Sequence, residues 1–130
     1  MQIMNGGIDL DTDTINVMLV TSAYTPNQDT HEDRADVTNQ VVGAGYIAGG
    51  AAIGSKVVTQ DNTDNEGVFD GADVTWSTAT ITARGAVIYK STGVAANDTL
   101  IAYLNFTTDQ TSTGADFTIA WNAEGIVNLN

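Results

Sequence analysis

The 130-residue chain has no cysteine, a single proline, a single histidine and only four lysine and arginine residues. Without cysteine it has neither a disulfide framework nor a thiolate metal site. It also lacks an apolar run of the roughly 20 residues that a membrane-spanning helix needs. Its first residues show neither the basic nor the apolar segment of a secretory signal peptide, so we expect cytoplasmic synthesis without export by the general secretory route.

The chain has 16 aspartate and glutamate residues but only four lysine and arginine residues, which gives it a net charge of −12. Proteins bind the phosphates of nucleic acids mainly through lysine and arginine, and anionic membrane surfaces attract the same side chains. We therefore expect no nucleic-acid partner and no membrane partner. A large charge of one sign also favours solubility and opposes association through polar surfaces.

Side chains that commonly catalyse reactions are scarce, and we expect the protein not to be an enzyme. A serine–histidine–aspartate device would have to combine Ser22, His31 and Asp36, but no nucleophile-elbow motif surrounds the serine. A pair of carboxylates can hydrolyse glycosides, which leaves a small hydrolase as an alternative. Because nearly all the acidic residues fall in expected loops, we predict no catalytic residue.

An acidic segment near the start of the chain begins like a calcium-binding loop. Asp9, Asp11 and Asp13 have the alternation of carboxylates that such a loop requires. However, Thr14 stands where the sharp-turn glycine belongs, and Val20 stands where the bidentate glutamate belongs. We expect a polar turn that leads into a strand, and we predict no metal site.

Two further segments have compositions that suggest ligands. Residues 43–50 are rich in glycine but lack the Gly-Lys-Ser/Thr ending of a phosphate-binding loop and the helix that should follow it. We expect a flexible or closely packed surface loop there and predict no cofactor-binding residue. A second acidic cluster contains Asp61, Asp64 and Glu66, and we interpret it as a solvated hairpin loop.

Several aromatic side chains are candidates for a carbohydrate-binding platform. They are Trp76, Tyr89, Tyr103 and Trp121. Trp121 shares its alternation phase with Phe117 and Ile119, which places it in the core. For Trp76 the pattern leaves both the platform and the core open.

Short runs rich in threonine, valine, isoleucine and aromatic residues alternate with glycine, asparagine and aspartate along the chain. Such runs predict roughly seven to nine strands and no long helix. The clearest strands cover residues 15–20, 80–90, 99–106 and 117–121, with shorter candidates at 37–42, 51–60, 68–70, 74–76 and 126–129. Turns are expected at 61–66 and 109–116. Gly85, in the middle of its strand, predicts a bulge or a close backbone approach.

This pattern predicts an all-β protein, a single antiparallel β-sandwich domain over residues 1–130, either jelly-roll-like or immunoglobulin-like. The residues of strand 80–90 expected to face inward are Ile81, Ala83, Val87 and Tyr89. The predicted core contains Ile15, Val17, Leu19, Ile81, Val87, Leu100, Leu104, Phe117, Ile119 and Trp121.

One long segment and several short ones carry a family resemblance. The long segment is IDLDTDTINVMLVTSAYTPNQDTH, residues 8–31, and the short ones are 36–39, 45–50, 73–76, 82–84, 86–90 and 100–103. Together and in this order they resemble a small-protein family encoded in the structural gene clusters of tailed phages. No functional residue is tied to these motifs.

The resemblance implies a virion structural protein, and we expect a head decoration (cement) protein that stabilises the shell. Its partner would be the major capsid protein, with association of further copies of itself on the capsid surface. Its location would be the exterior of the capsid after synthesis in the host cytoplasm, because the negative charge suits the exterior better than a lumen filled with DNA. The alternatives are a head–tail joining or tail component and a glycan-binding β-sandwich module, with or without the assistance of Ca²⁺.

Overall fold

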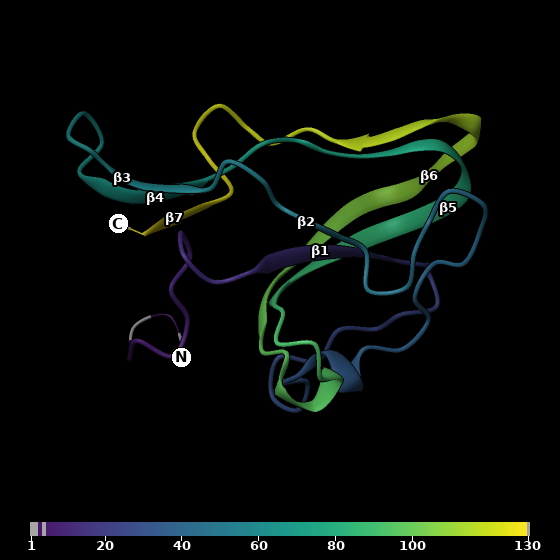
Figure 1. Cartoon of the computed structure of the whole chain (residues 1–130), viewed down its shortest axis with the longest axis horizontal. Helices are drawn as coiled ribbons and strands as arrows, with labels where there is room; N and C mark the ends of the chain where they lie inside the picture. The colour runs from purple at the N-terminus through teal and green to yellow at the C-terminus, as the bar shows by residue number, and fades with distance from the viewer. Residues whose placement is uncertain (1–2, 4, 130) are drawn as a thin grey trace.

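A computed structural model describes residues 3 and 5–129 of the chain (Figure 1). In the described part, strands account for most of the regular structure. The helical segments there are two short 3₁₀ turns, η1 (Arg34–Asp36) and η2 (Ala95–Asn97). Neither turn contains a buried residue, so the core is built by the strands together with buried loop residues such as Ile8, Val41 and Ile53.

The strands form two antiparallel sheets that pack together as an all-β sandwich, which confirms the predicted fold class. The first sheet has the order β2-β1-β5-β6, with β2 at Ala51–Ala52, β1 at Ile15–Val20, β5 at Val74–Lys90 and β6 at Leu100–Ile119. The second sheet has the order β3-β4-β7, with β3 at Val57–Asp61, β4 at Glu66–Asp70 and β7 at Val127–Leu129. The predicted strand at 51–60 is therefore divided between the two sheets, and residues 37–42 form no strand.

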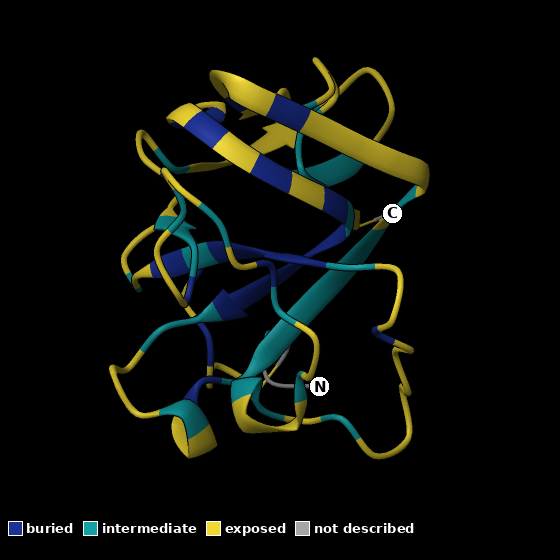
Figure 2. Ribbon diagram, turned by 90° about the vertical axis from the view of Figure 1, so that its right-hand side faces the viewer, coloured by how far each residue is buried: buried dark blue, intermediate teal, exposed yellow. Residues whose placement is uncertain are grey.

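The hairpin of β5 and β6 is longer than predicted. The expected strands at 74–76 and 80–90 are one strand, and the expected turn at 109–116 lies inside β6. The polar side chains of this segment find partners across the hairpin: the hydroxyls of Thr82 and Thr111 lie 2.9 Å apart. Along the first part of β5, buried and exposed residues alternate, and they appear as alternating bands in Figure 2.

Gly85 lies at a register shift between β5 and β6, which confirms the predicted bulge. A side chain at this position would lie 2.6 Å from the carbonyl oxygen of Leu104 and 2.8 Å from the ring of Tyr103, so the two backbones also approach closely. The bulge reverses the phase of the strand. Before it Ile81 packs in the main core, and after it Ile88 does so.

Two hydrophobic clusters cover opposite faces of β1 and β5. The main core contains residues of both sheets, including Ile15 and Val17 of β1 and Phe69 of β4. The second cluster lies on the other face and consists of Met18, Val20, Tyr24, Val87 and Tyr89. The prediction that Val87 and Tyr89 share a face with Ile81 and Ala83 is therefore wrong, because the bulge at Gly85 intervenes.

Most of the predicted core is buried. The buried members are Ile15, Val17, Leu19, Ile81, Val87, Phe117 and Ile119. Leu100, Leu104 and Trp121 are half-buried and pack against the clusters from the side. The first two belong to β6, an edge strand of its sheet, so only one flank of each is covered by a neighbouring strand.

The glycine-rich segment 43–50 is an irregular loop packed against the first sheet. Gly50 has a φ of +76°, and a side chain there would collide with the backbone of Val17. The Tyr46 hydroxyl accepts a hydrogen bond from the backbone N–H of Leu19 at 2.9 Å. Of the two predicted alternatives, close packing is the one that the structure shows.

Candidate functional site

The candidate catalytic residues Ser22, His31 and Asp36 form no hydrogen-bonded series in the described structure. His31 Nδ1 lies 3.0 Å from the hydroxyl of Tyr24, and the two rings stack with their centroids 5.7 Å apart. Asp36 Oδ2 instead accepts backbone hydrogen bonds from Glu32 and Asp33 at 3.0 and 3.1 Å. These bonds lower the pKa of Asp36. The carboxylate thus stabilises the turn η1 and does not orient the imidazole.

Tyr24 and His31 border a cavity of about 540 Å³ between their loop and β6. Tyr103 of β6 meets the ring of Tyr24 edge-on, with centroids 5.8 Å apart. The amide side chains of Asn27 and Gln28 also line the cavity. Burial raises the pKa of the Tyr24 hydroxyl, which keeps it protonated at neutral pH and available as a hydrogen-bond donor. The arrangement combines aromatic rings with amide and imidazole hydrogen-bonding groups.

The aromatic platform considered from the sequence does not form. Trp76 and Tyr89 are buried, at 5% and 2% exposure. Trp121 is half-buried, and its indole N–H donates to the carbonyl oxygen of Ala72 at 2.9 Å. Of the four candidates, Tyr103 is the one that lines the cavity beside Tyr24 and His31.

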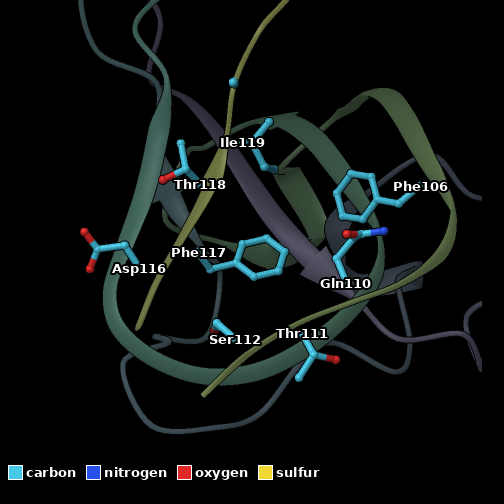
Figure 3. Close-up of a pocket in the computed structure, with 9 residues that line it drawn as sticks. Phe106, Gln110, Thr111, Ser112, Asp116, Phe117, Thr118 and Ile119 are labelled. Atoms are coloured by element: carbon cyan, nitrogen blue, oxygen red, sulfur yellow. The ribbon is translucent and has the colours of Figure 1, made fainter. Parts of the chain in front are cut away.

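A second cavity, of about 460 Å³, lies beside β6 where the strand bends (Figure 3). The rings of Phe106 and Phe117 point toward one another across it, and Ile119 lies on the same side as Phe117. Gln110 and Asp116 supply polar groups at its border. The cavity therefore combines apolar and polar lining next to an edge strand.

Internal ion pairs engage most of the cations. The pairs are Arg34–Asp98 at 2.7 Å, Arg84–Asp109 at 2.8 Å and Lys90–Asp13 at 2.8 Å. The remaining cation, Lys56, forms no ion pair with the residues that the structure describes. Among the residues that the structure describes, most of the 16 carboxylates consequently form no ion pair, and the surface of this part presents almost only negative charge.

Asp98 is the fully buried carboxylate of this set. It accepts hydrogen bonds from Arg34 Nε, from the backbone N–H of Thr92 at 2.6 Å and from the hydroxyl of Thr92 at 2.8 Å. Burial alone would raise the pKa of Asp98, but these donors outweigh burial and lower it. The ionised carboxylate therefore joins the η1 and η2 segments and has a structural role.

The acidic segments considered as metal sites serve local structure in part. Asp13 Oδ2 accepts the backbone N–H of Asp9 at 2.8 Å and pairs with Lys90. The turn at 61–66 is confirmed, and its Asp61 Oδ1 accepts the backbone N–H of Thr63 at 2.7 Å.

The structure groups Asp61 and Asp64 with Glu124, a residue that the sequence pattern did not indicate. One carboxylate oxygen of each lies within 4.8 Å of the others. The third acid predicted for this cluster, Glu66, instead accepts a hydrogen bond from Asn128 at 2.8 Å. Asp64 and Glu124 are exposed, and exposed acidic groups of this kind are common without a metal ion.

No protein-family model, curated protein or solved structure matches the chain. Among the described residues, no helix has both the length and the apolar character to cross a membrane. The function therefore has to be inferred from the residues of this chain and from the resemblance described above.

Proposed function

We propose that the protein is a structural component of a tailed-phage virion, and specifically a head decoration (cement) protein. In this role it binds the major capsid protein on the outer surface of the shell and strengthens the shell without catalysing a reaction. The resemblance of residues 8–31 and of the later segments is the observation that carries the proposal. The fold and the charge distribution support it.

The charge distribution favours the exterior of a capsid. Three of the four cations are engaged in internal ion pairs, so the net charge of −12 is carried outward. Packaged DNA makes the lumen strongly negative and would repel such a subunit. On the outer surface the same charge is solvated, and carboxylates at the contact can pair with basic residues of the shell.

The fold suits a cement role because a sandwich is a rigid unit that can bridge neighbouring shell subunits. Binding energy would come from a buried apolar centre, and a polar rim would set the register of the contact. Copies that also contact one another on the shell gain from multivalency, since each bound copy raises the effective concentration of the next contact. Many weak contacts can then resist internal pressure.

Deletion of the gene tests this proposal. Particles that lack the protein should assemble normally and release their DNA at a lower temperature than complete particles, and added protein should restore the difference. An unchanged release temperature would contradict the cement role. Tailless or leaking particles would instead favour the head–tail joining or tail component.

The cavity of Tyr24, His31 and Tyr103 favours one other function, a glycan-binding module. Tyrosine rings can stack against the apolar face of a sugar, and the amides of Asn27 and Gln28 can bond its hydroxyls. A glycan array probed with and without EDTA tests this alternative. Binding that Tyr103→Ala abolishes would support it, and the absence of binding to any glycan would contradict it. Loss of binding in EDTA would show that Ca²⁺ assists.

A further inference from the structure

β6 is the long edge strand of the first sheet. Through residues 110–119 it pairs with β5 on one side, and on its other side no described strand pairs with it. Backbone N–H and C=O groups on such a flank are free to pair with another chain. Of the other edge strands, β2 and β7 have only two and three residues, which limits pairing there, and β3 has five but lines neither of the two cavities described above.

A bulge defines where this open edge begins. Four residues of β6, 106–109, stand opposite Arg84, between the pairs Gly85–Asn105 and Ala83–Gln110. The ion pair between Arg84 and Asp109 holds the bulge in place. The pairing of β6 with β5 shifts register again beside Gly114, whose φ is +59°. From there to the end of the strand β6 carries no extra residue, so residues 115–119 form the regular part of the open edge.

The cavity of Figure 3 lies beside this edge. Phe106, Phe117 and Ile119 line it with apolar surface, and Ser112 and Thr118 come from the same stretch of strand. An added strand would place alternate side chains toward the sandwich, where one of them can enter the cavity. Strand addition draws affinity from main-chain hydrogen bonds and specificity from such pockets.

We propose that residues 115–119 of β6 take up an extended segment of a partner protein, with an apolar side chain in the cavity and lysine or arginine residues flanking it. The cationic character follows from charge: Asp116 borders the cavity, the nearby Arg84 is engaged with Asp109, and the whole chain carries −12. A second copy of this chain is disfavoured because it would bring two such negative surfaces together. The proposal rests on the proposed function only for the identity of the partner, the capsid shell.

Synthetic peptides test the docking site directly. The probe alternates threonine and valine around a central leucine and carries a lysine at each end; the matched control carries glutamates instead. The lysine peptide should slow amide hydrogen exchange in residues 115–119 and bind about tenfold more tightly than the control. No added protection, protection elsewhere, or equal binding of both peptides would overturn the proposal.

Two variants sharpen the test. Ala120 is exposed and lines the cavity, so Ala120→Trp should fill the cavity and weaken binding of the lysine peptide by about tenfold or more. Ala96→Trp, at an exposed position in η2, should leave binding unchanged. Unaltered exchange in β1 verifies that each variant is folded, and an Ala120→Trp variant that is folded and binds normally would contradict the role of the cavity.

The remaining outcomes distinguish a partner protein from a second copy of this chain at the edge of β6. They also distinguish failure of the docking site from failure of the cement role. If the same amides become protected as the protein is concentrated without peptide, a second copy is the occupant and the inference is wrong. Absence of the protein from virions would contradict the cement role but leave a positive peptide result standing. A negative peptide result would overturn the docking site and leave the cement role to be tested by gene deletion.

Discussion

Asp98 is a buried, ionised residue that connects two separate segments of the chain. Its carboxylate is fully buried, and its partners Arg34 and Thr92 come from two segments far apart in the sequence. Arg34 also lies over the ring of Tyr89, with its guanidinium carbon 5.5 Å from the centroid. One ionised group thus stabilises the end of the sandwich that holds both 3₁₀ turns.

Replacement of this carboxylate should be costly. We predict that Asp98→Asn lowers the free energy of unfolding by about 2–3 kcal/mol at neutral pH, because charge-assisted bonds are lost in a buried place. Chemical denaturation measures the change, and the exposed Asp29→Asn serves as the control for loss of a negative charge. A cost similar to that of the control would contradict the structural role.

The same substitution should change the pH dependence of stability. The folded-state pKa of Asp98 is lowered from 3.8, so its contribution is present above the unfolded-state value and is lost as the pH falls below about 4. The difference between the parent protein and Asp98→Asn should therefore shrink in acid. Unfolding curves at several pH values measure this, and a difference that stays constant from neutral pH to acid would argue against it.

Burial depth distinguishes two aliphatic residues on neighbouring strands. Ile88 is fully buried in β5, whereas Leu104 of β6 is half-buried. Ile88→Ala should cost about 2–5 kcal/mol and Leu104→Ala about 1–2 kcal/mol. Denaturant midpoints at unchanged slope provide the comparison, and equal costs would contradict this account of the edge. Alternation in the sequence indicated that Leu104 faces the core, but it carries no information on which strand lies at the edge.

At the scale of the elements, the bulge beside Gly85 is the feature that reverses the two faces of β5. We predict that Gly85→Ala destabilises the protein by about 1–3 kcal/mol, since a methyl group there meets Leu104 and Tyr103. Gly67→Ala in β4 is the matched control, because the nearest atom would lie 4.0 Å away, and its effect should stay within about 1 kcal/mol. Thermal or chemical unfolding of both variants decides the matter: equal effects would show that the close approach at Gly85 is unimportant.

The elements also show what the sequence could and could not predict. Strand 15–20 and the bulge were predictable because apolar alternation and an interrupting glycine are local signals. Segment 109–116 was not, because its aspartate, glutamine, threonine and glycine are typical of a turn. In the structure they extend β6, where β5 presents complementary polar groups such as Thr82 opposite Thr111. That partnership depends on a residue far away in the chain.

The candidate cavities are likewise properties of long-range packing. The sequence singled out His31 as the sole imidazole and Tyr103 as an aromatic candidate, but nothing local places them at one cavity. The loop that carries Tyr24 and His31 meets β6 only through tertiary packing, as where the ring of Tyr24 lies edge-on to that of Tyr103. The excess of negative charge, by contrast, is evident from the composition. The ion pairs add only that most of the cations are used internally, so the excess negative charge lies on the surface.

At the scale of the whole molecule, the charge predicts how the protein meets nucleic acid. The isolated protein should show no DNA binding in a gel-shift assay at about 150 mM salt, because three of its four cations are already paired with its own carboxylates. A complex at micromolar protein would show that this interpretation of the charge is wrong. A very acidic protein without basic patches is the appropriate negative control.

The composition of purified virions tests the central claim most directly. Quantitative mass spectrometry should find this protein in the particle at a copy number comparable to that of the major capsid protein, because a cement protein repeats with the shell lattice. Absence from the particle, or only the few copies that one ring at the head–tail junction would supply, would contradict the account.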